Sequence, residues 1–142
     1  MASWSISFFG LGYVGLTTAA CFASRGFKVI GYDINRDKVK LVNQGYSPIY
    51  EPDLEKLIKK SIRNKHLRVT TDPHEAILNT NITFITTGTP SKADGSIDLT
   101  YVKSAAKMIG EALVQKDKWH LIVIKSTVVP TTTENVIKPI IE

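Results

Sequence analysis

The sequence has little of the chemistry that secreted, membrane-spanning and metal-binding proteins depend on. Its one cysteine, Cys21, cannot form an internal disulfide, so we expect a reducing cytoplasm as its compartment. No apolar run reaches the roughly 20 residues that span a bilayer, and residues 1–5 lack the basic start of a secretory signal. The three histidines share no spacing with acids or with the cysteine that would predict a metal site: His66, His74 and His120.

Charge of either sign is moderate, with 18 Lys+Arg against 13 Asp+Glu and a formal net charge of +5. Such an excess attracts nucleic acid, anionic membranes or phosphate-bearing small molecules. The one dense basic stretch, residues 56–68, interleaves its cations with apolar residues at helical spacing. This pattern favours a solvated helix face over a partner surface, and we expect neither a nucleic-acid nor a membrane partner.

Strand-like and helix-like segments alternate along the chain. Apolar or β-branched runs predict strands at residues 6–9, 27–32, 67–70, 82–86 and 121–125. Helical periodicity with start and stop signals predicts helices at residues 14–25, 35–44, 52–62, 72–78 and 99–115, and a last one from Thr131. We expect Pro139 to bend or end that last helix. Cys21 follows two alanines, and we expect it to be buried against the sheet.

Alternating strands and helices are typical of a parallel sheet covered on both faces. The runs 82–86 and 121–125 are continuously apolar or β-branched, as strands buried on both faces should be. We therefore predict one α/β domain over residues 1–142, with a Rossmann-type doubly wound parallel sheet in three layers. The six-stranded version of this fold needs one more strand after the last helix.

The first predicted strand runs directly into a G-x-G-x-x-G pattern, Gly10-Leu11-Gly12-Tyr13-Val14-Gly15. The pattern alone is a weak signal. Here it follows a strand, opens a helix and precedes an acid, Asp33, by roughly 20 residues at the end of the next strand. In such turns the first glycine permits a tight bend, the second lets a pyrophosphate approach, and the third packs helix against sheet. We predict a dinucleotide site, with a purely structural glycine turn as the alternative.

Asp33 also favours one cofactor over another. A carboxylate accepts hydrogen bonds from a free ribose 2′-hydroxyl and repels a 2′-phosphate, which predicts NAD. Arg36 lies three residues further on and keeps NADP as the alternative.

Four blocks of the sequence resemble the UDP-glucose/GDP-mannose dehydrogenase family, whose members oxidise the C6 alcohol of a nucleotide sugar to a carboxylate. The blocks are residues 10–16, 45–54, 88–99 and 125–128. The first is common among dehydrogenases, but all four in this order are specific. The resemblance implies NAD-dependent oxidation of UDP-glucose, the commonest activity of the family, with GDP-mannose as the main alternative substrate.

The resemblance also implies roles for single residues. Beyond the glycine turn and Asp33, the implied cofactor-binding residues are Lys38, Thr86, Thr87, Gly88, Thr89, Pro90, Ser126 and Thr127. Thr127 resembles a threonine near the reacting water and the nicotinamide, and it is the one catalytic candidate in this sequence. Without the resemblance, Lys38 would be interpreted as a solvated helix charge, and the threonines as ordinary turn residues.

Two departures from the family pattern shape what we expect of this chain. The run Val129-Pro130-Thr131-Thr132-Thr133 lacks the glycine that the family commonly has there. The family's nucleophilic cysteine and its other catalytic residues are expected after residue 142, as is the long helix through which its members form homodimers. We therefore expect this chain to bind NAD without turnover. A non-catalytic NAD-sensing module is the alternative from another functional class.

Overall fold

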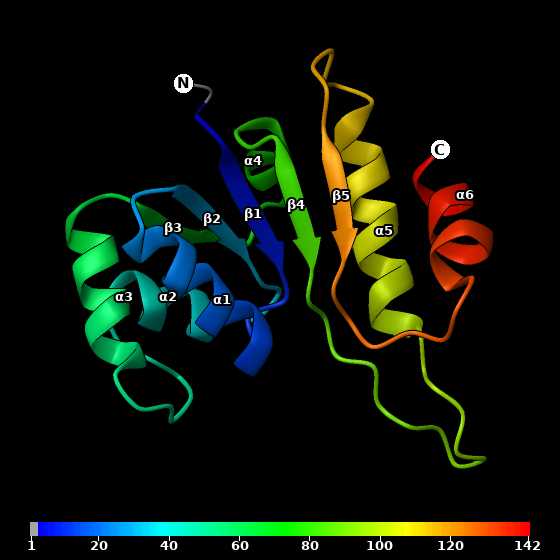
Figure 1. Ribbon diagram of the computed structural model, residues 1–142, viewed down its shortest axis with the longest axis horizontal. Helices are drawn as coiled ribbons and strands as arrows, with labels where there is room; N and C mark the ends of the chain where they lie inside the picture. Colours follow the sequence, from blue (N-terminus) through cyan, green and yellow to red (C-terminus); the bar gives the residue numbers. More distant parts are fainter. Residues whose placement is uncertain (1–2) are drawn as a thin grey trace.

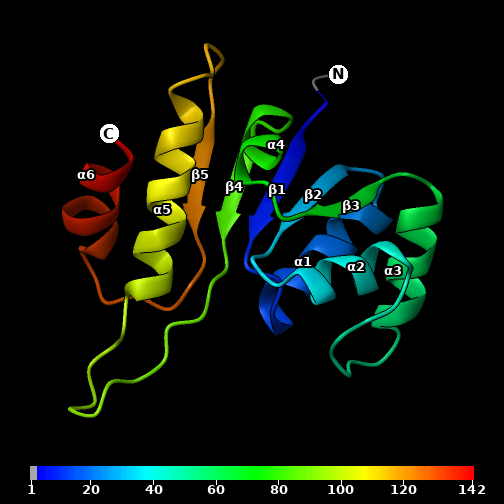
Figure 2. The same cartoon turned by 180° about the vertical axis from the view of Figure 1, so that it is seen from behind.

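The computed structural model describes residues 3–142 and consists of a five-stranded sheet between two layers of helices (Figures 1 and 2). The strands are β1 (Ser5–Phe9), β2 (Lys28–Tyr32), β3 (Leu67–Thr70), β4 (Ile82–Ile85) and β5 (Leu121–Ile124). They pair in parallel in the order β3-β2-β1-β4-β5. The predicted Rossmann-type sheet is confirmed. Met1 and Ala2, which open the segment tested for a secretory signal, lie outside the described residues.

The helices follow the strands in the alternation that the sequence predicts. They are α1 (Tyr13–Ser24), α2 (Arg36–Asn43), α3 (Leu54–Arg63), α4 (Pro73–Leu78), α5 (Thr100–Leu113), the π-helical turn η1 (Thr133–Ile137) and α6 (Lys138–Ile141). Helices α1, α2 and α3 pack on one face of the sheet, and α4, α5 and η1 pack on the other (Figure 2). No helix within residues 3–142 has the length and apolar character needed to cross a membrane.

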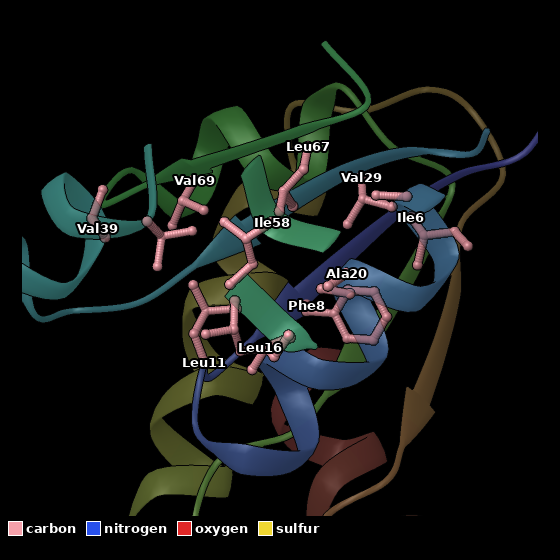
Figure 3. Close-up of a cluster of buried hydrophobic side chains, with 14 residues drawn as sticks. Ile6, Phe8, Leu11, Leu16, Ala20, Val29, Val39, Ile58, Leu67 and Val69 are labelled. Carbon is pink, nitrogen blue, oxygen red and sulfur yellow. The ribbon is translucent and has the colours of Figure 1, made fainter. Parts of the chain in front are cut away.

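Successive side chains of β1 enter two separate cores, because strand residues alternate between faces. Ile6 and Phe8 join the core under α1 and α3, where Leu16 and Ile58 meet them (Figure 3). Phe9 joins the opposite core, formed with α4 and α5. Each fully buried Leu, Ile or Phe stabilises the fold by roughly 1.5–3 kcal/mol. The two cores together fix the middle strands and hence the loops that leave them.

The two edges of the sheet are finished differently. At the β3 edge, the Asn43 amide pairs with the backbone of Val69, donating to its carbonyl at 2.8 Å and accepting from its N–H at 2.9 Å. This side chain occupies groups that would otherwise pair with another strand. At the other edge, Leu121 at the start of β5 is 43% exposed. The expectation that residues 121–125 are buried on both faces is wrong, because β5 is the outermost strand among the described residues.

One further expectation is corrected by α1. Cys21 is exposed, not buried. The buried residues of α1 recur at spacings of three and four, and Cys21 falls on the opposite side of the helix. The π-helical turn η1 runs directly into α6, and Pro139 lies just after this junction. The expectation that Pro139 bends or ends the last helix stays a prediction.

A polar network lies on the α5 face of the sheet, toward the amino ends of the strands. Lys116 Nζ donates to His120 Nδ1 at 2.8 Å, and His120 Nε2 lies 2.6 Å from Thr83 Oγ1. Thr83 Oγ1 in turn lies 2.6 Å from Ser7 Oγ. Burial, assisted by the Lys116 charge, lowers the pKa of His120 to about 4. The imidazole is therefore neutral at physiological pH and links the loop before β5 to the centre of the sheet.

Within residues 3–142, three non-glycine residues adopt left-handed backbone conformations, with φ of 64° at Asp53, 60° at Lys65 and 74° at Thr131. A β-branched residue such as Thr131 is the most strained of these. It lies in the run 129–133, which contains no glycine. The turn after β5 therefore holds a threonine in a conformation that glycine adopts more easily.

Replacing Thr131 or Asp53 by glycine should stabilise the chain. Glycine enters the left-handed region without steric cost, so we expect a gain of about 0.5–1 kcal/mol at each site, net of the freedom that glycine adds to the unfolded chain. Urea denaturation measures the effect. The control is Asp37→Gly within α2, which should lose about 1 kcal/mol because glycine disfavours helix. Destabilisation by both Thr131→Gly and Asp53→Gly would contradict the assigned backbone strain.

Candidate functional site

The carboxyl ends of β1, β2, β4 and β5 border a cavity of about 690 Å³. The strand order reverses between β1 and β4, because the chain leaves β1 toward β2 on one side and returns to β4 on the other. Loops diverge at such a switch point, and open α/β sheets bind ligands in the resulting crevice. The residues that the sequence singles out lie on the loops after these four strands and in the first turns of α1 and α2.

Each glycine of the turn after β1 has its own steric reason. A Cβ on Gly10, whose φ is 104°, would lie 2.9 Å from the backbone of Thr87. A Cβ on Gly15 would lie 1.8 Å from the carbonyl oxygen of Gly10, so α1 can start beneath the bend only with glycine there. A Cβ on Gly12 would meet nothing within 4 Å. Gly12 lines the cavity, and its missing side chain leaves room for a ligand.

Leu11 anchors the glycine turn through both its side chain and its backbone. Its side chain is fully buried in the core under α1 (Figure 3), and Gly31 on β2 makes room for it. Its backbone N–H donates to Asp33 Oδ2 at 2.9 Å. The turn is therefore held in place without any ligand.

Asp33 is 9% exposed and lies at the end of β2, where it also lines the cavity. Its Oδ1 accepts from the N–H of Asn35 at 2.9 Å, and its Oδ2 lies 3.5 Å from Lys38 Nζ in addition to the bond from Leu11. An ionised carboxylate has about four lone-pair positions. Three are taken by protein donors, which leaves acceptor capacity for a ligand hydroxyl.

Side-chain hydroxyls connect the three loops around the cavity. Thr86 Oγ1 donates to the carbonyl of Gly10 at 2.7 Å, and Ser126 Oγ donates to the carbonyl of Thr87 at 2.6 Å. These bonds tie the loop after β4 to the loops after β1 and β5. Thr87 Oγ1 is buried and has no hydrogen-bond partner within residues 3–142. Thr87 lines the cavity as a residue, but its hydroxyl oxygen is not exposed to it.

Most of the site residues suggested by the sequence line this one cavity. They are Gly10, Leu11, Gly12, Tyr13, Val14, Asp33, Lys38, Thr86, Thr87, Gly88, Thr89, Ser126 and Thr127. Gly15 lies behind the turn, and Pro90 lies further along the loop, outside the lining. Contacts of these residues with a cofactor stay predictions. No group of three potential metal ligands occurs in the described part of the chain.

The sequence did not point to the far wall of the cavity. This wall is formed by residues after β2 and β5 and by one face of α5: Tyr32, Ile34, Thr100, Tyr101, Ser104, Ala105, Met108 and Lys125. Helical periodicity assigns α5 a buried face but does not say which end of it borders a cavity. The Tyr32 hydroxyl donates to Met108 Sδ at 3.2 Å, and burial, followed by the Asp33 charge, raises the pKa of Tyr32.

Residues 4–142 match the UDP-glucose/GDP-mannose dehydrogenase family, NAD binding domain. The chain belongs to this family. Its members named below are NAD-dependent nucleotide-sugar dehydrogenases, and the domain matched here is their NAD-binding part. That the glycine turn, Asp33 and the hydroxyl-linked loops surround the NAD of this domain stays our prediction.

Relatives with two substrates are similar to this chain at comparable levels. GDP-mannose 6-dehydrogenase of Pseudomonas aeruginosa is 46% identical over 137 residues, and UDP-glucose 6-dehydrogenase of Haloferax volcanii is 50% identical over 137 residues. Both alignments cover 96% of this chain and 31% of the relative. The chain therefore spans about a third of the length of these relatives.

Solved structures give the same picture. A ternary complex of the Pseudomonas aeruginosa GDP-mannose dehydrogenase superposes with a TM-score of 0.95 at 46% identity, covering 96% of this chain and 31% of that one. A UDP-glucose dehydrogenase from Pyrobaculum islandicum has a TM-score of 0.95 at 41% identity, covering 99% and 32%. The fold and the family are shared with both substrate classes.

Alanine at two of the glycines should separate folding from NAD binding. Gly15→Ala places its methyl group against the Gly10 carbonyl oxygen. We expect the free energy of unfolding to fall by about 3 kcal/mol or more, and we expect NAD binding to be lost as well. Gly12→Ala meets no protein atom within 4 Å. It should cost less than about 1 kcal/mol while weakening NAD binding about tenfold or more, because the methyl group occupies ligand space. Urea denaturation and NAD titration of both variants test this, and unchanged NAD affinity in Gly12→Ala would refute it.

Proposed function

We propose that this chain is the cofactor-binding part of an enzyme that uses NAD to oxidise the C6 alcohol of UDP-glucose to a carboxylate. The proposal is supported by family membership and by the UDP-glucose dehydrogenases of Haloferax volcanii and Pyrobaculum islandicum among its relatives. GDP-mannose is the competing substrate, favoured by relatives at 46–49% identity. We further propose a homodimeric enzyme, as the family resemblance implies.

The single observation that carries the proposal is the pairing of the open space at Gly12 with the Asp33 carboxylate. The space lies at the amino end of α1, where free N–H groups and the helix dipole favour a pyrophosphate. Asp33, fixed by Leu11 and Asn35, keeps acceptor capacity for an adenosine ribose hydroxyl. The protein alone fixes the position of the open space at Gly12 relative to the Asp33 carboxylate. This pair of features suits a dinucleotide whose adenosine ribose has a free 2′-hydroxyl.

The remaining site residues fit the opposite half of the cofactor. Thr87 lines the cavity after β4, and exposed Thr127 lines it after β5. We propose that these two residues orient the nicotinamide end, with Thr127 nearest to the reacting groups. When bound, NAD would accept the hydride that the sugar loses on oxidation. The loops of this chain position it and, through the Ser126 bond to Thr87, keep the two threonine-bearing loops together.

The second functional class is an NAD sensor without chemistry. The same glycine turn would serve a sensor, but the family blocks at residues 45–54 and 125–128 have no purpose in one. Relatives of this chain that carry enzyme names match it over 96% of its length. We therefore favour the enzyme.

The 142-residue chain should bind NAD and show no turnover. Calorimetric titration should give clear preference for NAD over NADP, because the Asp33 carboxylate repels a 2′-phosphate. Asp33→Asn should lower the affinity for NAD about tenfold and should also lower the ratio of NAD affinity to NADP affinity about tenfold. Arg36→Gln is the matched control and should leave NAD affinity within about twofold. Equal affinity for both cofactors in the unchanged chain would overturn the NAD assignment, and NADH formation by this chain alone would show that the catalytic groups are misplaced.

The substrate is tested with the whole product of the gene, whatever its length. NADH formation is followed with UDP-glucose, GDP-mannose and UDP-N-acetylmannosamine in parallel. We expect UDP-glucose to give the highest kcat/KM and two NADH per sugar, since an alcohol becomes a carboxylate in two two-electron steps. Faster oxidation of GDP-mannose would replace the proposed substrate, and binding of NAD without turnover of any sugar would favour the sensor.

A further inference from the structure

A second cavity, of about 300 Å³, lies at the opposite end of the sheet. It borders the first residues of β1 and β2, the turn that leads into β3 and the turn after α4. It shares no lining residue with the NAD site, which lies at the carboxyl ends of the strands. Whatever binds there is therefore separate from the cofactor.

All ionisable side chains that line this second cavity belong to basic residue types: Lys28, Lys65, His66 and Arg68. Arg68 shares its charge with Glu75, at 3.4 Å between Nη2 and Oε1. Neither Lys28 nor Lys65 forms an ion pair within residues 3–142. Lys28 and Lys65, both exposed, thus line one small space without an acidic partner among the described residues, and an anion in that space would supply one.

Lys65 occupies this position at a backbone cost. It follows the C-terminus of α3 with φ of 60°, where its N–H donates to Ile62 and the next N–H donates to Ser61. This is the helix ending at which glycine is preferred. A lysine there adds backbone strain, and the same residue lines the cavity. The strain and the charge are independent observations on the same residue.

The neutral part of the lining is also suited to an anion. Asn79 and Ser5 add polar side chains, and the walls are completed by the buried β2 residues Val29 and Ile30. Lysine ammonium groups bind phosphate oxygens as strong point donors. The cations surround a hollow and do not extend along a stripe, which favours a compact anion over a nucleic-acid backbone.

We propose that this basic cavity binds a phosphate-bearing small molecule, held by Lys28 and Lys65 with His66 and Arg68 at its edge. The site is distinct from the NAD site and independent of the proposed reaction. It gives the domain a second anion site at the amino ends of its strands, about half the volume of the first.

The test is a titration of inorganic pyrophosphate into the 142-residue chain at low ionic strength, with NAD present in excess to occupy the glycine turn. Amide resonances report where the anion binds. We expect saturable shifts centred on Lys65, His66 and Lys28, and saturating binding by calorimetry. Shifts spread evenly over the basic surface, or confined to the glycine turn, would overturn the proposal, as would binding of an oligonucleotide but not of pyrophosphate.

Two variants sharpen the result. Lys65→Gly removes the ammonium and relieves the left-handed strain, so it should unfold at higher urea concentration and yet bind pyrophosphate about threefold to tenfold more weakly. Lys56→Gln removes one charge from the exposed side of α3, outside the cavity, and should change pyrophosphate affinity less than about twofold. Equal weakening in both variants would show a diffuse charge effect and overturn the site. Lys28→Gln repeats the test without altering a strained residue.

Discussion

The close approach of Gly15 to the carbonyl of Gly10 is the constraint on which the proposed NAD site depends. Because Gly15 has no Cβ, α1 begins directly beneath the bend, and its amino end faces the cavity. The bend is then held by the buried side chain of Leu11 and by the Thr86 hydroxyl on the Gly10 carbonyl. A ligand that binds at this turn therefore does not have to offset the entropy cost of ordering it, because the fold already holds the turn in place.

Asp33 connects this bend to the next strand and shows that a binding residue can also be structural. Its carboxylate accepts hydrogen bonds from two backbone N–H groups and lies near Lys38, so its position does not depend on a cofactor. Burial raises the pKa of the neighbouring Tyr32, and the Asp33 charge adds to that rise. In the proposed site, selectivity between NAD and NADP would therefore be decided by a charge placed before the ligand arrives.

Features defined by local pattern were predicted well from the sequence, and features defined by tertiary placement were not. The strand, the glycine turn and Asp33 follow from local pattern, because a tight bend and a helix start each need particular residue types. The exposure of Cys21 depends on which side of α1 meets the sheet. The cavity wall on α5, with Tyr101 and Met108, depends on where that helix ends relative to the loops, which no periodicity encodes.

Left-handed residues at element boundaries show where this chain tolerates strain. Asp53 precedes α3 and lies 3.4 Å from Lys56, a surface ion pair of little energetic weight. Thr131 lies in the turn after β5, close in sequence to Thr127 in the NAD cavity, and Lys65 lines the basic cavity at the other end of the sheet. Strained positions persist where the side chain or the loop conformation has a use. Because Lys65 lines the basic cavity and forms no ion pair within residues 3–142, its strain is the one that the proposed anion would explain most directly.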